Sequence, residues 1–183
     1  MLSLNRNKSC CVYFGARYNA DVDDHMLDDD KITENSSFIY LGIQFVKGKS
    51  IGVNIEPIRH IFFISCNNIL NHSSDLCDLV YLQLHESYVK PTLTYAAAEI
   101  KLSEAQIASL TTCWNSVYRR ILHFNRCELV KCFIRGLCRF DFRHLCLQLS
   151  TKRYLSLQLC KNSVVRDVFK LLFFQRSLYN SGS

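Results

Sequence analysis

Six aspartates stand close together in the stretch DVDDHMLDDD, residues 21–30. Two adjacent aspartates that follow a hydrophobic residue can hold two Mg²⁺ ions in nucleotide-polymerising enzymes. The metals bind the attacking and leaving oxygens of an in-line displacement. Such carboxylates serve this chemistry only when a rigid strand or turn fixes them. The segments around the stretch therefore decide whether it is an active site.

Two short segments rich in aromatic and β-branched residues flank the acidic stretch. Cys10–Gly15 and Phe38–Phe45 have the length of strands, and we expect them to pair as a hairpin. Residues 20–37 between them show no hydrophobic periodicity, which predicts a mobile, solvated loop. Because such a loop has no rigid turn, we interpret its aspartates as surface charges that bind divalent ions weakly at most.

From Asn54 onward the hydrophobic spacing changes to that of helices. Pro57 suits a first helical turn, Asn54 is a candidate cap, and we expect this helix to end near Asn71. Its predicted inward face consists of Ile58, Ile61, Phe62, Ser65, Cys66, Ile69 and Leu70. Asp75 is the expected cap of a second helix, which Lys90–Pro91 interrupts. The side chains predicted to point inward from it are Leu76, Leu79, Val80 and Leu84.

Ser103 and Gln106 form a capping box, which predicts the start of a long helix. One stripe of that helix carries Ile107, Leu110, Trp114, Val117, Tyr118 and Ile121, and we expect Trp114 in the core. Further helices are predicted over Cys127–Leu137, Phe142–Cys160 after an Asp141 cap, and Val164–Leu178. The fold class is therefore mainly α, with a small N-terminal β-hairpin in residues 1–53, including an acidic loop at 20–37, and an α-helical bundle in residues 54–183.

The formal net charge of +6 is unevenly distributed. Residues 1–34 hold seven acidic and four basic residues, a charge of −3, and the rest of the chain holds nine and 18, a charge of +9. Between Arg119 and Arg176, 13 basic residues stand against three acidic ones. Such an excess favours a polyanionic partner, nucleic acid before membrane. The alternative is an ordinary solvated helical surface.

Ten cysteines and six histidines raise the questions of disulfides and metal. No signal peptide opens the chain, which favours an intracellular protein, in cytoplasm or nucleus, with free thiols. The gaps between Cys127 and Cys146 do not suit zinc, and the histidines show no ligand spacing, so we expect them to be surface or partly buried groups. No apolar run is long enough to span a membrane.

Several segments together resemble a known family. In order along the chain they are LNRNKSCCVYFG, FIYLGIQF, EPIRHIFFISCNNIL, HESYVKPTLTYAAAEIKLS and CWNSVYRRILHFNR. They look like the C-terminal part of non-LTR (LINE-type) retrotransposon reverse transcriptases, and the resemblance runs from about Leu4 to at least Lys152. It implies a palm edge in the N-terminal segments and a thumb, a helical bundle that holds the template-primer duplex, from Pro57 onward.

The resemblance also implies roles for individual residues. Asn5 and Lys8 would lie at the palm edge near the incoming triphosphate, and Phe38, Tyr40, Leu41 and Gly42 would form the hairpin that supports the primer end. Thumb contacts to nucleic acid would come from Arg59, Arg119, Arg120, Arg126, Lys131 and Arg135. Taken alone, Lys8 is an ordinary surface lysine, and Tyr40 can equally be a packing residue of the hairpin or a nucleic-acid contact. Of the adjacent Arg119 and Arg120, at most one can share the buried stripe.

The order of the motifs places the family's metal-binding aspartate pair outside this chain. That pair precedes the NxxKS motif, which begins here at Asn5. We therefore expect a fragment that lacks the catalytic aspartates, is not an enzyme on its own and holds no cofactor, whereas Mg²⁺ serves the intact enzyme. Its expected partners are an RNA/DNA template-primer duplex, bound weakly and without sequence preference, and the missing palm and fingers, with no membrane.

A helical protein-interaction domain without a nucleic-acid role is the alternative function. Bases scattered around the bundle between Arg119 and Arg176 would favour it. The chain also departs from the family, with Cys127 where a tryptophan is common and Arg59-His60 where two arginines are usual. Without a palm to pack on, we expect an exposed apolar patch from Phe14, Phe38, Phe45 or Phe62.

Overall fold

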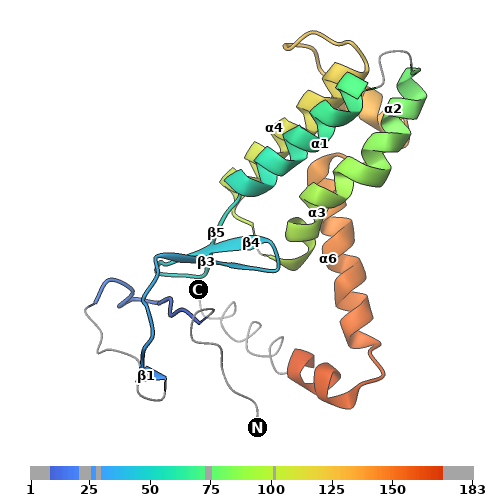
Figure 1. The fold of residues 1–183 in the computed structure, drawn as a ribbon. Helices are drawn as coiled ribbons and strands as arrows, with labels where there is room; N and C mark the ends of the chain where they lie inside the picture. The colour runs from blue at the N-terminus through green and yellow to red at the C-terminus, as the bar shows by residue number, and fades with distance from the viewer. Residues whose placement is uncertain (1–8, 21–25, 28–29, 73–75, 101, 171–183) are drawn as a thin grey trace. The chain divides into compact units, whose positions relative to one another are not determined.

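The computed structural model describes residues 9–20, 26–27, 30–72, 76–100 and 102–170 (Figure 1). The chain divides into two compact units, residues 1–68 and 69–183, and each is described by itself. The first unit contains a small antiparallel sheet and most of one helix, and the second contains helices. The expected fold class, mainly α with a small N-terminal β portion, is confirmed. The domain boundary after residue 53 stays a prediction.

The sheet of the first unit consists of β3 (Ser37–Tyr40), β4 (Ile43–Val46) and β5 (Gly52–Asn54). Only Leu41 and Gly42 join β3 to β4, with φ angles of 49° and 78°. Positive φ at both central positions is typical of a type I′ turn, whose twist suits a tight hairpin. Phe38–Phe45 therefore folds back on itself, so our expectation that it forms one strand paired with Cys10–Gly15 is wrong. The hairpin at Phe38, Tyr40, Leu41 and Gly42 that the resemblance implies is present, and its role at a primer end stays a prediction.

The segment Cys10–Gly15 forms isolated bridges instead of a regular strand. Cys11 bridges Glu34 and Phe14 bridges Gly48, both in parallel orientation. The Cys11 amide donates to the Thr33 carbonyl over 3.1 Å. The segment thus lies beside the chain on either side of the hairpin without pairing to the hairpin strands.

Part of the expected acidic loop is paired. A two-stranded antiparallel ribbon joins β1 (Met26–Leu27) to β2 (Asp30–Lys31). The prediction of a loop throughout residues 20–37 is therefore wrong at these positions, where a short connection allows local strand pairing. The other five aspartates of the stretch lie outside the described residues.

A chain of side-chain hydrogen bonds crosses one face of the sheet. Gln44 Nε2 donates to Ser37 Oγ over 3.2 Å, and Asn54 Nδ2 donates to Gln44 Oε1 over 2.8 Å. Asn54 Oδ1 in turn accepts the backbone N–H of Glu56 at the start of α1 (Glu56–His72) over 3.0 Å. Asn54 therefore acts at the helix start as predicted, and it links the helix to all three strands.

The buried face of α1 is narrower than predicted. Ile58, Phe62 and Cys66, four residues apart, are buried, whereas Ile61 is 52% exposed. The expected apolar patch of aromatic residues is also not found as described, because Phe62 is fully buried and Phe14, Phe38 and Phe45 are half-buried. The exposed large apolar side chains of the sheet region are Ile39, Tyr40, Leu41, Val46 and Ile51.

After the end of α1, the second unit contains one continuous helical rod formed by α2 (Asp78–Leu84), the π-helix η2 (His85–Val89) and α3 (Lys90–Glu99). Most of its buried residues recur every fourth position, at Tyr81, His85, Val89, Leu93 and Ala97, and Leu82 is buried next to the first of them. In a pure α-helix of 3.6 residues per turn, such a row drifts by about 40° at each step. A wider π turn in the middle corrects this drift, so the row stays on one face.

This arrangement corrects two predictions about the rod. Leu76, Leu79 and Val80 are exposed and Leu84 is half-buried, because the inward side of α2 carries Tyr81 and Leu82 instead. The predicted cap Asp75 lies outside the described residues. The helix also continues through Pro91. A proline ring collides with the carbonyl four residues earlier in a regular α-helix, and the π turn just before Pro91 widens the helix at that point.

The long helix α4 (Glu104–Ile121) matches its prediction closely. Ser103 Oγ accepts the Gln106 N–H while Gln106 Oε1 accepts the Ser103 N–H, so the capping box is confirmed. The buried stripe includes all the expected residues except Ile107, which is half-buried, and adds Cys113 and Asn115. The connection after α4 leads to α5 (Lys131–Gly136), which is shorter than predicted at its N-terminal side.

Helix α6 (Phe142–Gln158) packs against α3 and α4. Its predicted cap is confirmed, since Asp141 Oδ1 accepts the His144 N–H over 3.0 Å. Burial alone would raise the pKa of Asp141, but hydrogen bonds from His144 and the nearby Arg135 outweigh it, and the pKa is lowered. Residues 163–170 are helical, with Asn162 Oδ1 accepting the Val164 N–H, and the rest of the helix predicted to reach Leu178 lies outside the described residues.

The core of the second unit is a cluster of rings. His85, Trp114, Tyr118 and Phe142 are all buried, and the His85 ring lies 5.1 Å from Trp114 and 5.2 Å from Tyr118 between ring centroids. The core position of Trp114 is confirmed. Full burial of His85 contradicts the expectation of surface or partly buried histidines. Among the helices of the described ranges, none combines the length and the apolar character needed to cross a bilayer.

Candidate nucleic-acid interface

Five of the predicted contact residues lie together in the second unit, from the last turn of α4 to α5. They are Arg119, Arg120, Arg126, Lys131 and Arg135, and Glu128 is the one acidic residue among them in sequence. Arg119 is half-buried and Arg120 exposed, which confirms that only one of the adjacent arginines shares the buried stripe. Arg126, Lys131 and Arg135 are exposed. We call these five residues the basic cluster.

Residues 122–130, between α4 and α5, are held by a closed set of hydrogen bonds. The Glu128 N–H donates to the Asn125 carbonyl over 3.1 Å, which makes residues 125–128 a β-turn. Both carboxylate oxygens of Glu128 accept from Asn125, one from its backbone N–H over 3.0 Å and one from Nδ2 over 2.9 Å. Arg126 therefore stands at the tip of an ordered turn.

Two further interactions fix this turn to the neighbouring helices. Arg119 Nε donates to the Glu128 carbonyl over 3.0 Å, so part of this arginine is used internally. The Phe124 ring packs on Phe133 of α5, with the centroids 4.5 Å apart. In Figure 1 the connection, coloured yellow to orange, stands at the end of the unit where α4 finishes.

The other predicted site residues belong to the first unit. Asn5 and Lys8 lie outside the described residues. Tyr40 is 61% exposed at the end of β3, and Gly42 lies in the hairpin turn with positive φ. Arg59 forms an ion pair with Glu56 one helical turn earlier, with Nη1 and Oε1 2.6 Å apart. The basic cluster thus occupies one segment of the second unit, whereas the roles of Asn5, Lys8, Tyr40, Gly42 and Arg59 stay separate predictions.

Part of the basic excess is neutralised inside the second unit. Arg139 pairs with Glu86 of η2, and Arg143 pairs with Glu104 at the start of α4. Arg135 of the basic cluster is 4.0 Å from Asp141. Within the described residues, neither Arg126 nor Lys131 has an ion-pair partner. These two residues are the best placed of the cluster to meet an external anion.

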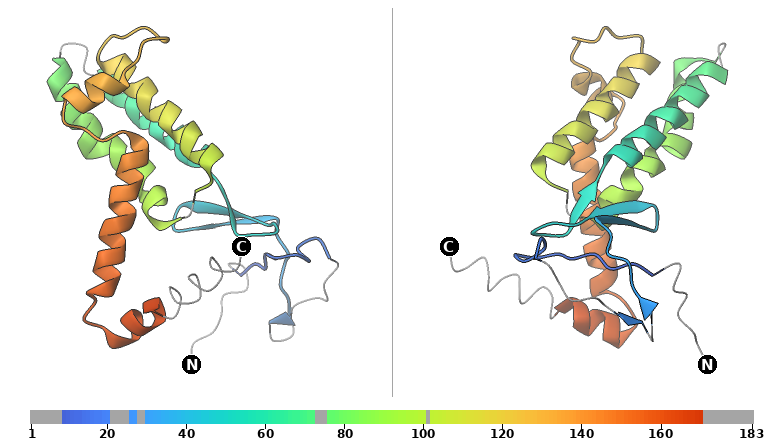
Figure 2. Two further views of the ribbon diagram at one scale, coloured as in Figure 1. Left: turned by 180° about the vertical axis from the view of Figure 1, so that it is seen from behind. Right: turned by 60° about the vertical axis from the view of Figure 1, so that its left-hand side comes forward.

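The remaining basic residues form a separate group. Within the described residues, Lys152 and Arg153 lie on the distal half of α6, Lys161 lies in the connection after it, and Arg166 and Lys170 lie on the helical residues 163–170. Figure 2 shows these segments, in orange to red, at the far end of the unit from the α4–α5 connection. The basic residues beyond Arg119 therefore do not form one continuous face.

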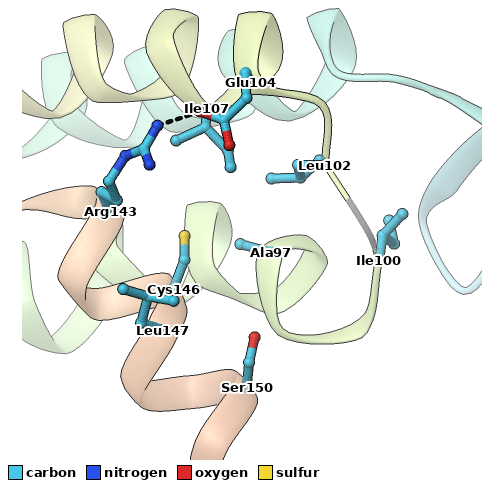
Figure 3. Close-up of a pocket in the computed structure, with 9 residues that line it drawn as sticks. All are labelled: Ala97, Ile100, Leu102, Glu104, Ile107, Arg143, Cys146, Leu147 and Ser150. Carbon is cyan, nitrogen blue, oxygen red and sulfur yellow. Dashed lines mark hydrogen bonds and ion pairs between the residues drawn. The ribbon is translucent and has the colours of Figure 1, made fainter. Parts of the chain in front are cut away.

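A cavity of about 220 Å³ lies between the end of α3, the start of α4 and the first half of α6 (Figure 3). Its wall is mainly apolar, and the Arg143–Glu104 ion pair lies at its edge. The Cys146 thiol points into it, and burial raises the pKa of that thiol to about 11. Cys146 is thus protonated at neutral pH and is not an activated nucleophile.

Two titratable side chains of the aromatic core have strongly shifted pKa values. Burial, with a smaller contribution from the charge of Lys90, lowers the pKa of His85 to about 4, and burial raises the pKa of Tyr118. Both groups are therefore neutral near pH 7 and are enclosed in the aromatic core. In the described ranges there is no group of three His, Cys, Asp or Glu side chains that could hold a metal ion.

Sequence reasoning placed Asn125 at the end of the long helix, which instead ends at Ile121, and it missed the interaction of Asn125 with Glu128. Read from the sequence, Glu128 only reduced the positive charge, whereas in the structure its carboxylate closes the turn that carries Arg126. The signal was the spacing Asn-x-x-Glu directly after a long helix, because Asn favours the first position of a turn and Glu three residues later can accept its N–H.

Comparisons with protein-family models, with curated proteins and with solved structures find no match to this chain. The resemblance to reverse transcriptases therefore stays a prediction that rests on the motifs quoted from the sequence. The geometry of the basic cluster is independent of that resemblance.

Proposed function

We propose that this chain carries the palm edge and thumb-like region of a non-LTR retrotransposon reverse transcriptase. In this proposal it binds RNA/DNA template-primer duplex weakly through phosphate contacts and without sequence preference. The observation that carries the proposal is the basic cluster, in which Arg126 on the ordered turn and Lys131 at the start of α5 are exposed and have no ion-pair partner in the described part of the chain. The ordered motifs of the sequence supply the family.

Basic side chains on a fixed frame suit phosphate binding for a physical reason. Phosphate contacts position a duplex and do not read its sequence, and each neutralised phosphate releases counterions. The logarithm of affinity then falls with the logarithm of salt concentration by about 0.9 for each phosphate contacted in B-DNA. Because Arg119 and Arg135 are partly engaged within the protein, we expect about two to four contacts from this cluster.

We further propose that the chain is not a polymerase on its own. Its 183 residues contain no Ala-Asp-Asp triplet, and the aspartates of residues 21–30 follow the NxxKS motif instead of preceding it. In the intact parent enzyme, such a pair would hold the Mg²⁺ ions of the reaction. Metal-dependent extension of a primer by this 183-residue protein would contradict the proposal.

The binding proposal is tested by the salt dependence of affinity for a labelled RNA–DNA hybrid, measured by fluorescence anisotropy between about 50 and 200 mM salt. The double variant Arg126→Ala/Lys131→Ala should bind more weakly and reduce the slope by about two. A matched control, Lys152→Ala/Lys161→Ala, removes the same charge from the separate group and should leave the slope nearly unchanged. Equal effects of the two double variants would show a diffuse charge effect instead of a site.

A helical protein-interaction domain is the second candidate function. It is favoured by the division of the basic residues into two groups and by exposed apolar side chains near the basic cluster, with Leu129 77% and Phe133 53% exposed. Absence of salt-dependent binding to any duplex, together with a folded protein, would favour this function over the first.

A further inference from the structure

We propose that residues 125–128 form a phosphate-presenting turn in which Glu128 is a positioning residue for Arg126. This inference rests on the proposed function and adds to it a defined contact residue and the acid that holds it. It assigns a stabilising role in anion binding to a negatively charged side chain inside a positively charged cluster.

The geometry of the turn carries the inference. Arg126 occupies the second position of the β-turn closed by the Glu128 N–H and the Asn125 carbonyl, and it is exposed. The carboxylate of Glu128 accepts two hydrogen bonds from Asn125, the residue directly before Arg126. Hydrogen bonds to a carboxylate are roughly twice as strong as neutral ones. The backbone on both sides of Arg126 is therefore fixed by one side chain.

The turn is also joined to the more buried part of the unit. Arg119 Nε donates to the Glu128 carbonyl, and the Phe124 N–H donates to the Arg119 carbonyl over 2.9 Å. Tyr118, next to Arg119, is fully buried in the aromatic core. Arg126 thus stands on a frame that extends from the core of α4 to the surface. A side chain on such a frame loses less conformational freedom on binding than one on an unrestrained loop.

Charge and positioning predict opposite effects for the removal of Glu128. If only the net charge of the cluster matters, Glu128→Ala removes one negative charge and should strengthen binding to a polyanion. If Glu128 positions Arg126, the same substitution should weaken binding in spite of the added charge. The sign of the change in affinity therefore decides between the two.

The experiment compares Glu128→Ala with Asp167→Ala, which also removes one negative charge. Asp167 is exposed in the separate basic group and has no partner in the described ranges, so only the charge changes there. Binding of a labelled RNA–DNA hybrid is measured at about 100 mM salt, a concentration at which phosphate contacts still govern affinity. We expect Glu128→Ala to weaken binding about three- to tenfold, the loss expected for one phosphate contact, and Asp167→Ala to strengthen it slightly.

Two more variants separate positioning from a general loss of structure. In an Arg126→Ala background, Glu128→Ala should have little further effect, because residues that act together are not additive. Glu128→Gln should restore most of the binding, since its amide oxygen can still accept the Asn125 N–H. Circular dichroism should show the same helix content in every variant.

Each outcome is decisive. If Glu128→Ala strengthens binding as Asp167→Ala does, or weakens it equally with and without Arg126, the positioning role is wrong while the proposed function stands. If the unchanged protein binds no duplex in a salt-dependent manner, the proposed function and this inference both fail.

Discussion

The two units of the molecule are stabilised in different ways. Of the 20 apolar side chains that are buried in the described residues, 15 belong to residues 69–183 and only five to residues 1–68. Ile43, which is 6% exposed, is the one buried residue of the three strands. The sheet is instead organised by a tight turn and by the hydrogen bonds of Ser37, Gln44 and Asn54. Side-chain volume should therefore matter most in the second unit, and backbone geometry most in the first.

The largest expected effect is that of Trp114→Ala in the aromatic core. Truncating a buried aromatic ring costs about 3 to 5 kcal/mol of unfolding free energy, since it removes both transfer energy and packing. Phe45→Ala in the sheet should cost only about 1 to 2 kcal/mol, because this ring is half-buried against Phe38. Chemical denaturation followed by far-ultraviolet circular dichroism measures both.

Trp114 is the only tryptophan, so fluorescence cannot follow its removal. Tyr88→Ala, at a ring that is 68% exposed on η2, is the matched control and should change stability by less than about 0.5 kcal/mol. Equal losses for Trp114→Ala and Phe45→Ala would show that the contrast between the units is wrong.

A second prediction concerns acid. The pKa of His85 is about 4 in the folded protein and 6.5 when unfolded, so the unfolded chain takes up a proton first as the pH falls. The stability that depends on neutral His85 is complete above pH 6.5 and decreases towards pH 4. Between pH 7 and pH 5 we expect a loss of about 2 kcal/mol from this residue.

His85→Leu should remove most of this pH dependence, whatever it does to stability at pH 7. His60→Gln, at an exposed histidine of α1, serves as the control and should leave the dependence unchanged. A His85→Leu protein that still loses the full amount between pH 7 and pH 5 would contradict the assignment.

The smallest expected effect tests the hairpin turn. Gly42 has a φ of 78°, and a Cβ added there would meet no heavy atom within 4 Å. Gly42→Ala should therefore lower the free energy of unfolding by about 1 kcal/mol through backbone conformation alone. Hydrogen exchange of the β3 and β4 amides should accelerate while exchange in the second unit is unchanged. Gly136→Ala in α5, where φ is ordinary, should be neutral or slightly stabilising.

The features that could be predicted from the sequence are mostly local. The Ser103–Gln106 capping box, the Asp141 cap and the stripe of α4 were all predicted correctly, because each depends on residues within a few positions of one another. The same holds for Asn54 at the start of α1.

Features that depend on unusual backbone geometry could not be predicted. Leu41 has a φ of 49°, a region that leucine rarely adopts, so the residue types at Leu41–Gly42 did not indicate a two-residue turn, and only the resemblance implied a hairpin there. In the candidate site, the basic residues were found from charge alone. The turn at residues 125–128 depends on hydrogen bonds in both directions between Asn125 and Glu128. A count of charges treats Glu128 only as a negative charge and does not reveal these bonds.

The π turn at His85–Val89 also limits how this chain can change in length. A π turn spans one more residue than an α turn, and here that residue keeps Tyr81 and Leu93 on the same side of the rod. Deleting one residue between them would rotate one half of the rod against the other, so that either His85 leaves Trp114 or Leu93 and Ala97 turn to solvent. We expect substitutions on the exposed side of this segment to leave the core intact, whereas deletion of a single residue would require half of the bundle to repack.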